Sequence, residues 1–399
     1  MWRGLRLAVR CCRSPHHSKK ATGDNTMYPI LIVGAGKIGA SIAKLLHHSG
    51  DYKVTVADRD QAALERLAKY VPVETTLLDV KSPEDLARAL DGKKGVLSAC
   101  SFDINPGIAE AALHAGVSYF DLTEDVETTR RIRELAKEAK QGQIFMPQCG
   151  LAPGFIGILG YALAKRFDKL DSVKMRVGAL PQYPHNHLKY NLTWSTDGLI
   201  NEYCNPCEAI VGGKPIEVLA LEGLEHFSLD GLEYEAFNTS GGLGTLCETL
   251  DGKINELNYK TVRYPGHQYL MDFLINGLKM GSEVARRKQL KEIMENALPI
   301  TRQDVVLVYV SASGWKDGFY MQETDARKIY HQDIHGEHWS SIQLTTSAGA
   351  TAVIDLHRTG KLPGKGFVSQ EQVNLDEFLA NRFGRYYSTD SEHAEKVKL

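Results

Sequence analysis

A glycine-rich motif is the first group of residues in the sequence with the spacing of a ligand-binding site. It runs Gly34-Ala-Gly36-Lys37-Ile38-Gly39, directly after a short β-branched apolar run and at the start of a helical period. In a strand–turn–helix unit, such glycines allow a tight turn, close approach of the backbone to a pyrophosphate, and close packing of the helix on the strand. The N–H groups at the helix N-terminus then face the phosphates. The motif predicts a dinucleotide-binding site.

An acidic residue follows this motif at the interval of about 20 residues that is typical of such sites. Asp58 ends the second expected strand, where its carboxylate would accept hydrogen bonds from a ribose and repel a 2′-phosphate. This favours NAD as the cofactor. Arg59 could stack on adenine or pair with a phosphate, which keeps NADP as the alternative. Asp79 and Val80, after the third strand, are either the border of an adenine site or an ordinary strand end.

Polar residues at the ends of later strands are candidates for the reacting end of the site, because ligands bind at the carboxyl edge of such sheets. Cys100 ends the fourth expected strand and Asp121 the fifth. Asp121 could be a buried carboxylate with a shifted pKa or an acid near a helix N-terminus. Cys149 follows the sixth strand, either as a proton-transfer group or as a small apolar wall. Asp121 and Cys149 are the predicted catalytic pair.

The segments around these residues alternate between strands and helices, which predicts an α/β fold with a doubly wound parallel Rossmann sheet over residues 27–150. The expected strands are 30–33, 53–57, 73–78, 95–99, 118–121 and 143–146. The expected helices are 38–48, 61–70, 83–90, 108–115 and 126–139.

The sequence pattern changes after residue 150, and residues 151–364 are expected to form an α+β substrate-binding and dimerisation domain. Its first helix is expected at 155–166, and strands are expected at 172–177, 305–310 and 340–346. The sheet could pair with that of a second copy, which predicts a homodimer. Residues 365–388, with a helix at 375–383, are expected to return to the Rossmann domain, and residues 389–399 form a loose tail.

The composition of the 399-residue chain is that of a folded protein of two or three domains. A formal net charge of -2 gives no general attraction to nucleic acid or anionic lipid. No apolar run is long enough to span a membrane, so a soluble protein is expected. The seven cysteines fit a reducing compartment, and no metal-binding motif is present.

The first 26 residues differ from the rest, because no acidic residue precedes Asp24 and several basic residues alternate with apolar ones. The basic residues are Arg3, Arg6, Arg10, Arg13, Lys19 and Lys20. This pattern is typical of an organelle transit peptide, with a disordered basic tail as the alternative. It predicts a mitochondrial-matrix protein; a cytoplasmic location is the alternative.

Several linked motifs together resemble the saccharopine dehydrogenase family over about residues 28–387. Besides the glycine motif, they are Asp121-Leu-Thr, Cys149-Gly-Leu-Ala-Pro-Gly154, Gly178-Ala-Leu-Pro181, Tyr190-Asn-Leu-Thr-Trp-Ser195 and Arg263-Tyr-Pro-Gly266-His267. The resemblance implies a Rossmann domain, a dimerising α+β domain, and NAD(P)-linked oxidation of a C–N bond to an imine that water hydrolyses. It also implies a small amino-acid substrate from lysine metabolism.

Within the family, an acidic segment favours one subgroup over another. In the pattern that this resemblance implies, saccharopine reductases carry an arginine in the segment where this chain has Asp197 and Glu202. Some of them also have a tyrosine at the position of Phe102. Acids in that segment would bind an ammonium group and repel the carboxylates of a glutamate arm. The segment therefore resembles L-lysine 6-dehydrogenases more closely, with the L-glutamate-forming saccharopine dehydrogenases as the alternative.

The remaining substrate residues follow from the same resemblance. Arg263 would pair with the amino-acid carboxylate, or else form an interdomain salt bridge. His267 would be a substrate-site base, or else a packed turn histidine. A second class of function stays open, that of a catalytically silent dinucleotide-binding protein.

Overall fold

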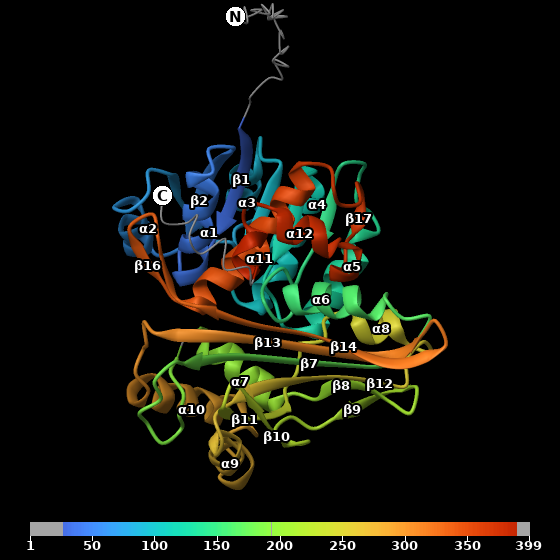
Figure 1. Cartoon of the computed structure of the whole chain (residues 1–399). Helices are drawn as coiled ribbons and strands as arrows, with labels where there is room; N and C mark the ends of the chain where they lie inside the picture. The colour runs from blue at the N-terminus through green and yellow to red at the C-terminus, as the bar shows by residue number, and fades with distance from the viewer. Residues whose placement is uncertain (1–26, 193, 389–399) are drawn as a thin grey trace, which may run out of the picture.

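The computed structural model describes residues 27–192 and 194–388. The transit peptide expected over residues 1–26 and the loose tail expected over residues 389–399 lie outside these ranges. Two sheets form two layers, one above the other in Figure 1, with helices around the upper sheet and between the layers. A single hydrophobic cluster extends across both, from Ile30 and Val56 in the upper sheet to Val173 and Val306 in the lower one.

The first sheet has seven parallel strands in the order β17-β6-β5-β4-β1-β2-β3, which is the doubly wound order predicted from the sequence. Its central strands are apolar and buried because helices cover both faces. The strands are β1 (Tyr28–Val33), β2 (Tyr52–Asp58), β3 (Glu74–Leu77), β4 (Gly95–Ser98), β5 (Ser118–Asp121), β6 (Ile144–Met146) and β17 (Gly366–Phe367).

Three of the five helices that connect these strands begin at a side-chain cap. Asp60, Ser82 and Asp125 each accept a hydrogen bond from a backbone N–H of the first turn of the helix that follows. The helices are α1 (Lys37–His48), α2 (Gln61–Ala68), α3 (Pro83–Leu90), α4 (Asn105–Ala115) and α5 (Val126–Ala136), with a short 3₁₀ turn η1 (Phe102–Ile104). Each lies within a few residues of the helix expected from the sequence.

The second sheet is mixed, with the order β10-β11-β12-β7-β13-β14, and β8 and β9 extend it beside β12. Its strands are β7 (Lys169–Pro181), β8 (Cys207–Val211), β9 (Lys214–Val218), β10 (Glu225–Leu229), β11 (Leu232–Asn238), β12 (Glu256–Arg263), β13 (Asp304–Lys316) and β14 (Phe319–Tyr330). A separate hairpin consists of β15 (Gln332–Ile334) and β16 (Glu337–Trp339). β7 pairs with β12 in parallel and with β13 in antiparallel orientation, and β13 pairs with β14 in antiparallel orientation.

Most of the remaining helices pack on this sheet or between the two sheets, and α12 (Leu375–Ala380) lies in the upper layer of Figure 1. The others are α6 (Phe155–Ala164), α7 (Thr196–Cys204), α8 (Leu246–Leu250), α9 (His267–Asp272), the π-turn η2 (Phe273–Gly277), α10 (Val284–Ala297) and α11 (Ser341–Arg358). Two further 3₁₀ turns are η3 (Gln370–Gln372) and η4 (Gly384–Tyr387). In Figure 1, α6 lies between the layers, whereas α9 and α10 lie on the far side of the second sheet.

The prediction of a strand at residues 340–346 is wrong, because α11 begins in this segment. Ser340 and Gln343 form a capping box, and the buried Asp304 carboxylate accepts hydrogen bonds from the N–H groups of Ser341 (2.6 Å) and Ile342 (3.2 Å). α11 is buried nearly all round, between α1 of the first domain and β13 of the second. A helix without a polar face lacks the usual amphipathic period and so resembles a strand in sequence.

The C-terminal segment lies against the first domain, where β17 adds the seventh strand beside β6. Arg382 donates hydrogen bonds to Asp51 (2.6 Å) at the start of β2 and to Asp355 (2.8 Å) on α11. Asp355 also accepts a hydrogen bond from the hydroxyl of Tyr52 (2.7 Å). This partly buried cluster joins the end of the described chain to the start of β2 in the first sheet.

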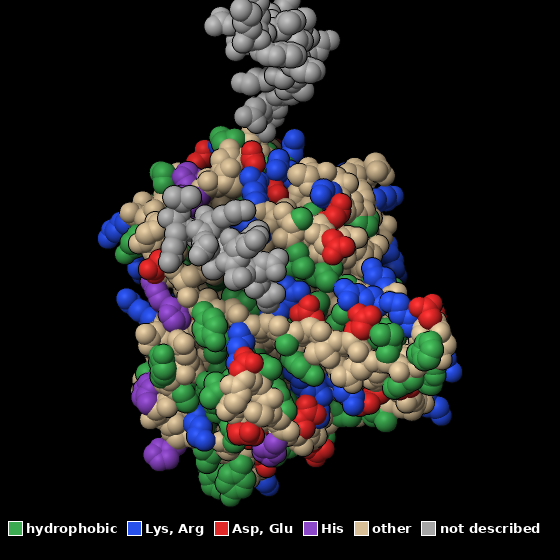
Figure 2. Space-filling model, in the orientation of Figure 1, with side chains coloured by type: hydrophobic (Ala, Val, Ile, Leu, Met, Phe, Trp, Pro, Cys, Tyr) green, Lys and Arg blue, Asp and Glu red, His purple; other side chains and the backbone are tan. Residues whose placement is uncertain are grey.

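Within the described ranges, no helix combines the length and the apolar character that crossing a membrane requires. Likewise, these residues contain no group of three His, Cys, Asp or Glu side chains arranged to hold a metal ion. On the face shown in Figure 2, Lys and Arg are interspersed with Asp and Glu.

The close packing of α11 generates a stability prediction for Gly349→Ala. A Cβ at Gly349 would lie 2.6 Å from the Gly150 carbonyl oxygen and 2.9 Å from that of Cys149. We expect this substitution to lower the melting temperature although alanine is the better helix former. Gly107→Ala in α4 is the matched control, because a Cβ there meets nothing within 4 Å, and it should leave stability equal or higher by up to about 1 kcal/mol. Equal melting temperatures for the two variants would refute the tight contact.

Candidate active site

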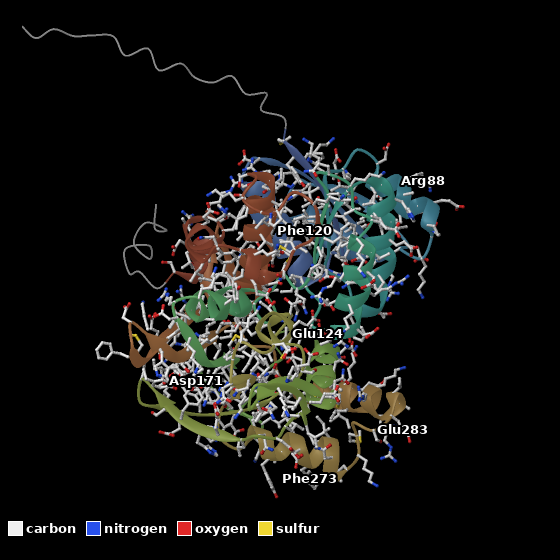
Figure 3. The ribbon with its side chains drawn as sticks, turned by 90° about the vertical axis from the view of Figure 1, so that its right-hand side faces the viewer. Arg88, Phe120, Glu124, Asp171, Phe273 and Glu283 are labelled. Carbon is white, nitrogen blue, oxygen red and sulfur yellow. The ribbon has the colours of Figure 1, made fainter. Side chains whose placement is uncertain are left out.

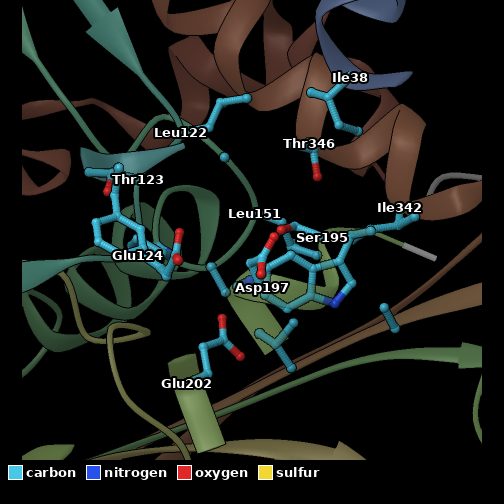
Figure 4. Close-up of a pocket in the computed structure, with 18 of the residues that line it drawn as sticks. Ile38, Leu122, Thr123, Glu124, Leu151, Ser195, Asp197, Glu202, Ile342 and Thr346 are labelled. Carbon is cyan, nitrogen blue, oxygen red and sulfur yellow. The ribbon is translucent and has the colours of Figure 1, made fainter. Parts of the chain in front are cut away.

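A cavity of about 310 Å³ lies between the two domains, at the carboxyl end of the first sheet. From the first domain it is lined by Ile38, by Ala99–Phe102 after β4, by Leu122–Glu124 after β5 and by Gly150–Pro153 after β6. Ile342 and Thr346 of α11 close one side. Figure 4 shows these loops around the cavity.

The second domain supplies the opposite wall through two neighbouring strands and one helix. β12 contributes Tyr259, Thr261 and Arg263, and β7 contributes Val177 and Ala179. Residues two apart on a strand point to the same face, so this alternation presents one face of the sheet to the cavity. The α7 segment adds Trp194, Ser195, Asp197, Gly198 and Glu202.

The glycine motif has the local geometry of a dinucleotide cradle. Gly34 has φ +106°, and a Cβ there would lie 2.9 Å from the Ala99 carbonyl oxygen. A Cβ at Gly39 would overlap the Gly34 carbonyl, whereas a Cβ at Gly36 would meet nothing within 4 Å. Gly36 precedes α1, whose first N–H groups have no acceptor within the helix. The open space at Gly36 therefore fits a pyrophosphate.

Asp58 lies beside this cradle, as its position at the end of β2 predicts. Its carboxylate accepts hydrogen bonds from the N–H groups of Ala35 (2.6 Å) and Asp60 (2.8 Å). The carboxylate thus fixes the glycine turn itself. Arg59 is exposed next to it, and neither Asp79 nor Val80 borders the cavity.

Cys100 does reach the cavity, near the glycine turn. Its thiol donates to the Val33 carbonyl (3.4 Å), and burial raises its pKa to about 11. The side chain therefore stays a neutral thiol. Phe102, on the turn that follows, lines the cavity as well.

Asp121 and Cys149, the predicted catalytic pair, are fully buried and are not among the residues that line the cavity. The Asp121 carboxylate accepts hydrogen bonds from the Tyr119 hydroxyl (2.8 Å) and from the N–H groups of Thr123 (3.0 Å) and Gln148 (2.9 Å). Burial raises its pKa to about 6, and these hydrogen bonds oppose that rise. The Cys149 thiol donates to the Met146 carbonyl (2.9 Å).

Of the predicted substrate residues on β12 and α9, Arg263 lines the cavity and His267 does not. Arg263 is buried, donates to the Tyr203 hydroxyl (3.0 Å) and the Val262 carbonyl (2.8 Å), and lies over the Tyr190 ring. It forms no salt bridge with any described residue. The His267 ring contacts the Leu188 carbonyl and the Tyr203 hydroxyl, and burial lowers its pKa to about 3. The structure therefore places His267 behind Arg263 as a packed, neutral ring.

The two acids on α7 differ in their surroundings. Glu202 is only 7% exposed and lines the cavity, and its carboxylate accepts no hydrogen bond from the described residues. Burial, followed by the neighbouring Glu124, raises its pKa well above the usual range. Asp197 is exposed at the mouth and forms a salt bridge with Lys291 of α10. An ammonium group bound at Asp197 would therefore compete with Lys291.

Glu124 was not predicted from the sequence to be a site residue. In the structure Asp125 alone caps α5, accepting from Thr128 (2.7 Å), and Glu124 points into the cavity. Trp194, Tyr259 and Thr261 were also missed, although the alternation of 259, 261 and 263 on a strand could have indicated the last two.

Family models match nearly the whole described chain. Residues 30–146 match the saccharopine dehydrogenase NADP binding domain, and residues 150–384 match the saccharopine dehydrogenase C-terminal domain. The chain belongs to the saccharopine dehydrogenase family. This confirms the family predicted from the sequence, and it identifies the first domain of this family member as an NAD(P)-binding domain.

Two curated relatives are similar at low identity. The saccharopine dehydrogenase [NADP(+), L-glutamate-forming] of Saccharomyces cerevisiae is 28% identical over 313 residues, which are 72% of this chain and 68% of the yeast protein. The mitochondrial alpha-aminoadipic semialdehyde synthase of Rattus norvegicus is 22% identical over 202 residues. That match covers 49% of this chain and only 22% of the rat protein.

A solved structure confirms the predicted fold class. The apo saccharopine dehydrogenase (L-Glu forming) of Saccharomyces cerevisiae superimposes with a TM-score of 0.73 at 16% identity, over 92% of this chain and 98% of that one. Like that structure, this chain combines a parallel Rossmann-like sheet with a second, mixed sheet.

The cradle geometry predicts different results for two glycine variants. Gly36→Ala should fold with a melting temperature near that of the parent but bind NADH and NADPH at least about tenfold more weakly, because a methyl group would fill the phosphate space. Gly39→Ala should lose both binding and stability, since its Cβ would overlap the Gly34 carbonyl. Titration calorimetry and thermal unfolding measure the two effects. A Gly36→Ala variant with parental affinity would contradict this assignment.

Proposed function

We propose that the chain is an NAD(P)-dependent oxidoreductase that oxidises a C–N bond of an amino acid in lysine metabolism. The observation that carries this proposal is the shared cavity. It brings Ile38 and Cys100 of the dinucleotide domain together with the buried Arg263 and Glu202 of the second domain. Such a cavity suits a zwitterionic substrate whose reacting carbon lies next to the cofactor end of the first sheet.

In this proposal, separate residues bind the cofactor and the substrate. NAD(P), when bound, supplies the acceptor for one hydride. The α1 N-terminus and Gly36 would hold the pyrophosphate, and Asp58 would keep the glycine turn in place. Arg263 would bind a substrate carboxylate, because two of its nitrogens are already fixed by Tyr203 and Val262 and the guanidinium is oriented in advance.

For the substrate we propose saccharopine, a secondary amine, with L-glutamate as a product. The activity for which the yeast relative is named supports this choice. The mouth of the cavity supports it too, since a neighbouring groove shares Ser101, Phe102 and Asp197 with the cavity and is lined by Arg287, Lys288 and Lys291 of α10. These cations, among several acids, could bind carboxylates of a glutamate arm, which the sequence analysis did not anticipate.

A second candidate, L-lysine 6-dehydrogenase, is favoured by one observation. Glu202 is a buried acid whose carboxylate accepts no hydrogen bond from the described residues, and Arg263 is the only Arg or Lys among the described residues that line the cavity. An ammonium group would be attracted to such an environment and a second carboxylate would be repelled. The Asp197–Lys291 salt bridge weakens this candidate, because it removes one of the two acids expected to bind the ammonium.

For the cofactor we propose NAD, with NADP as the alternative. The Asp58 carboxylate at the end of β2 would repel a 2′-phosphate. The family's first domain is named for NADP binding and the yeast relative for NADP(+), which supports the alternative. Arg59 is exposed beside Asp58 and is the residue that would pair with a 2′-phosphate.

The homodimer and the mitochondrial location remain proposals. β14 is an edge strand of the second sheet with Phe319 and Tyr320 exposed near its start, which supports pairing with a second copy. The rat relative is named as mitochondrial, which supports the location proposed from the first 26 residues.

The substrate proposal predicts NAD(P)H formation by the full chain with L-saccharopine in preference to L-lysine. Lys288→Ala should raise the KM for saccharopine several-fold with little change in kcat, because Lys288 is a mouth cation outside the reacting cavity. Arg286→Ala on the same helix is the control, since it does not line the groove. Initial rates with NAD and with NADP decide the cofactor.

Each other outcome supports a named alternative. Turnover of lysine alone would establish the 6-dehydrogenase. Binding of the dinucleotide without turnover of either amine would favour the catalytically silent protein.

A further inference from the structure

Glu124 lies at the junction of the two domains, where β5 ends and the first sheet faces the second. Figure 3 shows it between the upper and lower layers, and Figure 4 shows its side chain directed into the cavity toward Glu202. The residue is half-buried, and it lines the cavity together with Cys100 of the cofactor domain and Arg263 of the substrate wall. It is the acid that the first domain presents to this space.

The backbone at Glu124 is held so that its carboxylate is free to act. Gly241 has φ +82°, and a Cβ there would overlap the Glu124 carbonyl oxygen, so the loop before α8 packs directly on this peptide. Asp125 takes the capping position of α5. The Glu124 carboxylate interacts with its own backbone N–H and with the Asn201 side chain of α7.

The other ionisable groups that line the cavity are less suited to exchange a proton. Asp197 is in a salt bridge with Lys291, and Arg263 stays charged. Burial raises the pKa values of the Cys100 thiol and the Tyr259 hydroxyl. Glu202 is more deeply buried than Glu124, and burial raises its pKa well above the usual range.

The charges around Glu124 come from its own loop and from α7. Burial, followed by the negative charges of Asp125 and Asp121, raises its pKa to about 7, and the Asn201 hydrogen bond opposes the rise. Across the cavity, Glu202 interacts with Glu124 and with Arg263. A carboxyl group that titrates near the working pH can both accept and donate a proton.

We infer that Glu124 is the proton-transfer group of the reaction, acting on the reacting nitrogen and on the water that hydrolyses the imine. This inference rests on the proposed function. The Glu124 carboxylate takes one proton from the substrate ammonium and releases it to solvent. The C–H bond then breaks, its electron pair leaves as hydride to the bound nicotinamide dinucleotide, and the nitrogen lone pair forms the C=N bond.

Hydrolysis uses the same group three times. Glu124 takes a proton from water as its oxygen bonds to carbon, and then gives that proton to nitrogen. The C–N bond breaks with its electrons going to nitrogen, while Glu124 passes the hydroxyl proton to the departing amine. One amine is oxidised, one dinucleotide is reduced, and one proton is released overall.

Glu124→Gln tests the inference, with Glu127→Gln as the matched control because Glu127 is exposed in the first turn of α5. We expect kcat to fall about 10²–10⁴-fold in Glu124→Gln, while NADH affinity and KM change little. In the parent, kcat/KM should rise with pH through about 7, because the base must be ionised, and this limb should vanish in the variant. Parental kcat with the limb intact would overturn the inference.

A titration without substrate keeps the inference testable whether or not saccharopine is turned over. Carboxyl carbon NMR of the full chain should show one glutamate titrating near pH 7 that is absent in Glu124→Gln and present in Glu127→Gln. A Glu124 that titrates near the ordinary glutamate value would refute the role. Failure of every amine substrate combined with the expected titration would instead reject the proposed function and leave the Glu124 carboxyl correctly described.

Discussion

The buried carboxylate of Asp121 is the interaction on which the site depends. One oxygen accepts hydrogen bonds from the N–H groups of Thr123 and Gln148, and the other accepts the Tyr119 hydroxyl and the Asn105 amide (3.4 Å). The Asn105 amide oxygen in turn accepts the Ser98 hydroxyl (2.7 Å). The loops that follow β4, β5 and β6 are thereby tied to one group, and an unpaired buried donor would cost about 1–3 kcal/mol at each position.

This anchoring places the reactive surface where two sheets meet. The loops at the carboxyl end of the first sheet contain Glu124 and Cys100, which line the cavity. The buried helix α11 packs between these loops and the second domain. One face of the second sheet borders the cavity, and the Arg263 side chain reaches the cavity from that face of β12. The cavity therefore exists only when both domains are in place, and its charges come from both.

The first domain was predictable because its signals are local. Glycine spacing, the acid at 58 and apolar strands between capped helices each depend on a few neighbouring residues. The site was only partly predictable. A buried Asp121 was one of two predicted alternatives, and whether a strand-end acid faces a cavity or the loops behind it depends on packing partners far away in sequence, such as Gln148. For the same reason Glu124 was not predicted as a site residue, the Asp197–Lys291 salt bridge was not predicted, and the start of α11 was predicted as a strand.

The most direct test of this arrangement compares Asp121→Asn with Asp121→Ala in turnover and melting temperature. If Asp121 positions the loops, the asparagine, which keeps an acceptor oxygen for Thr123 and Gln148, should retain turnover within about tenfold of the parent. The alanine variant should lose most turnover together with stability. If both variants were equally inactive while keeping the parental melting temperature and dinucleotide affinity, Asp121 would be the proton acceptor itself, and the positioning role would be wrong.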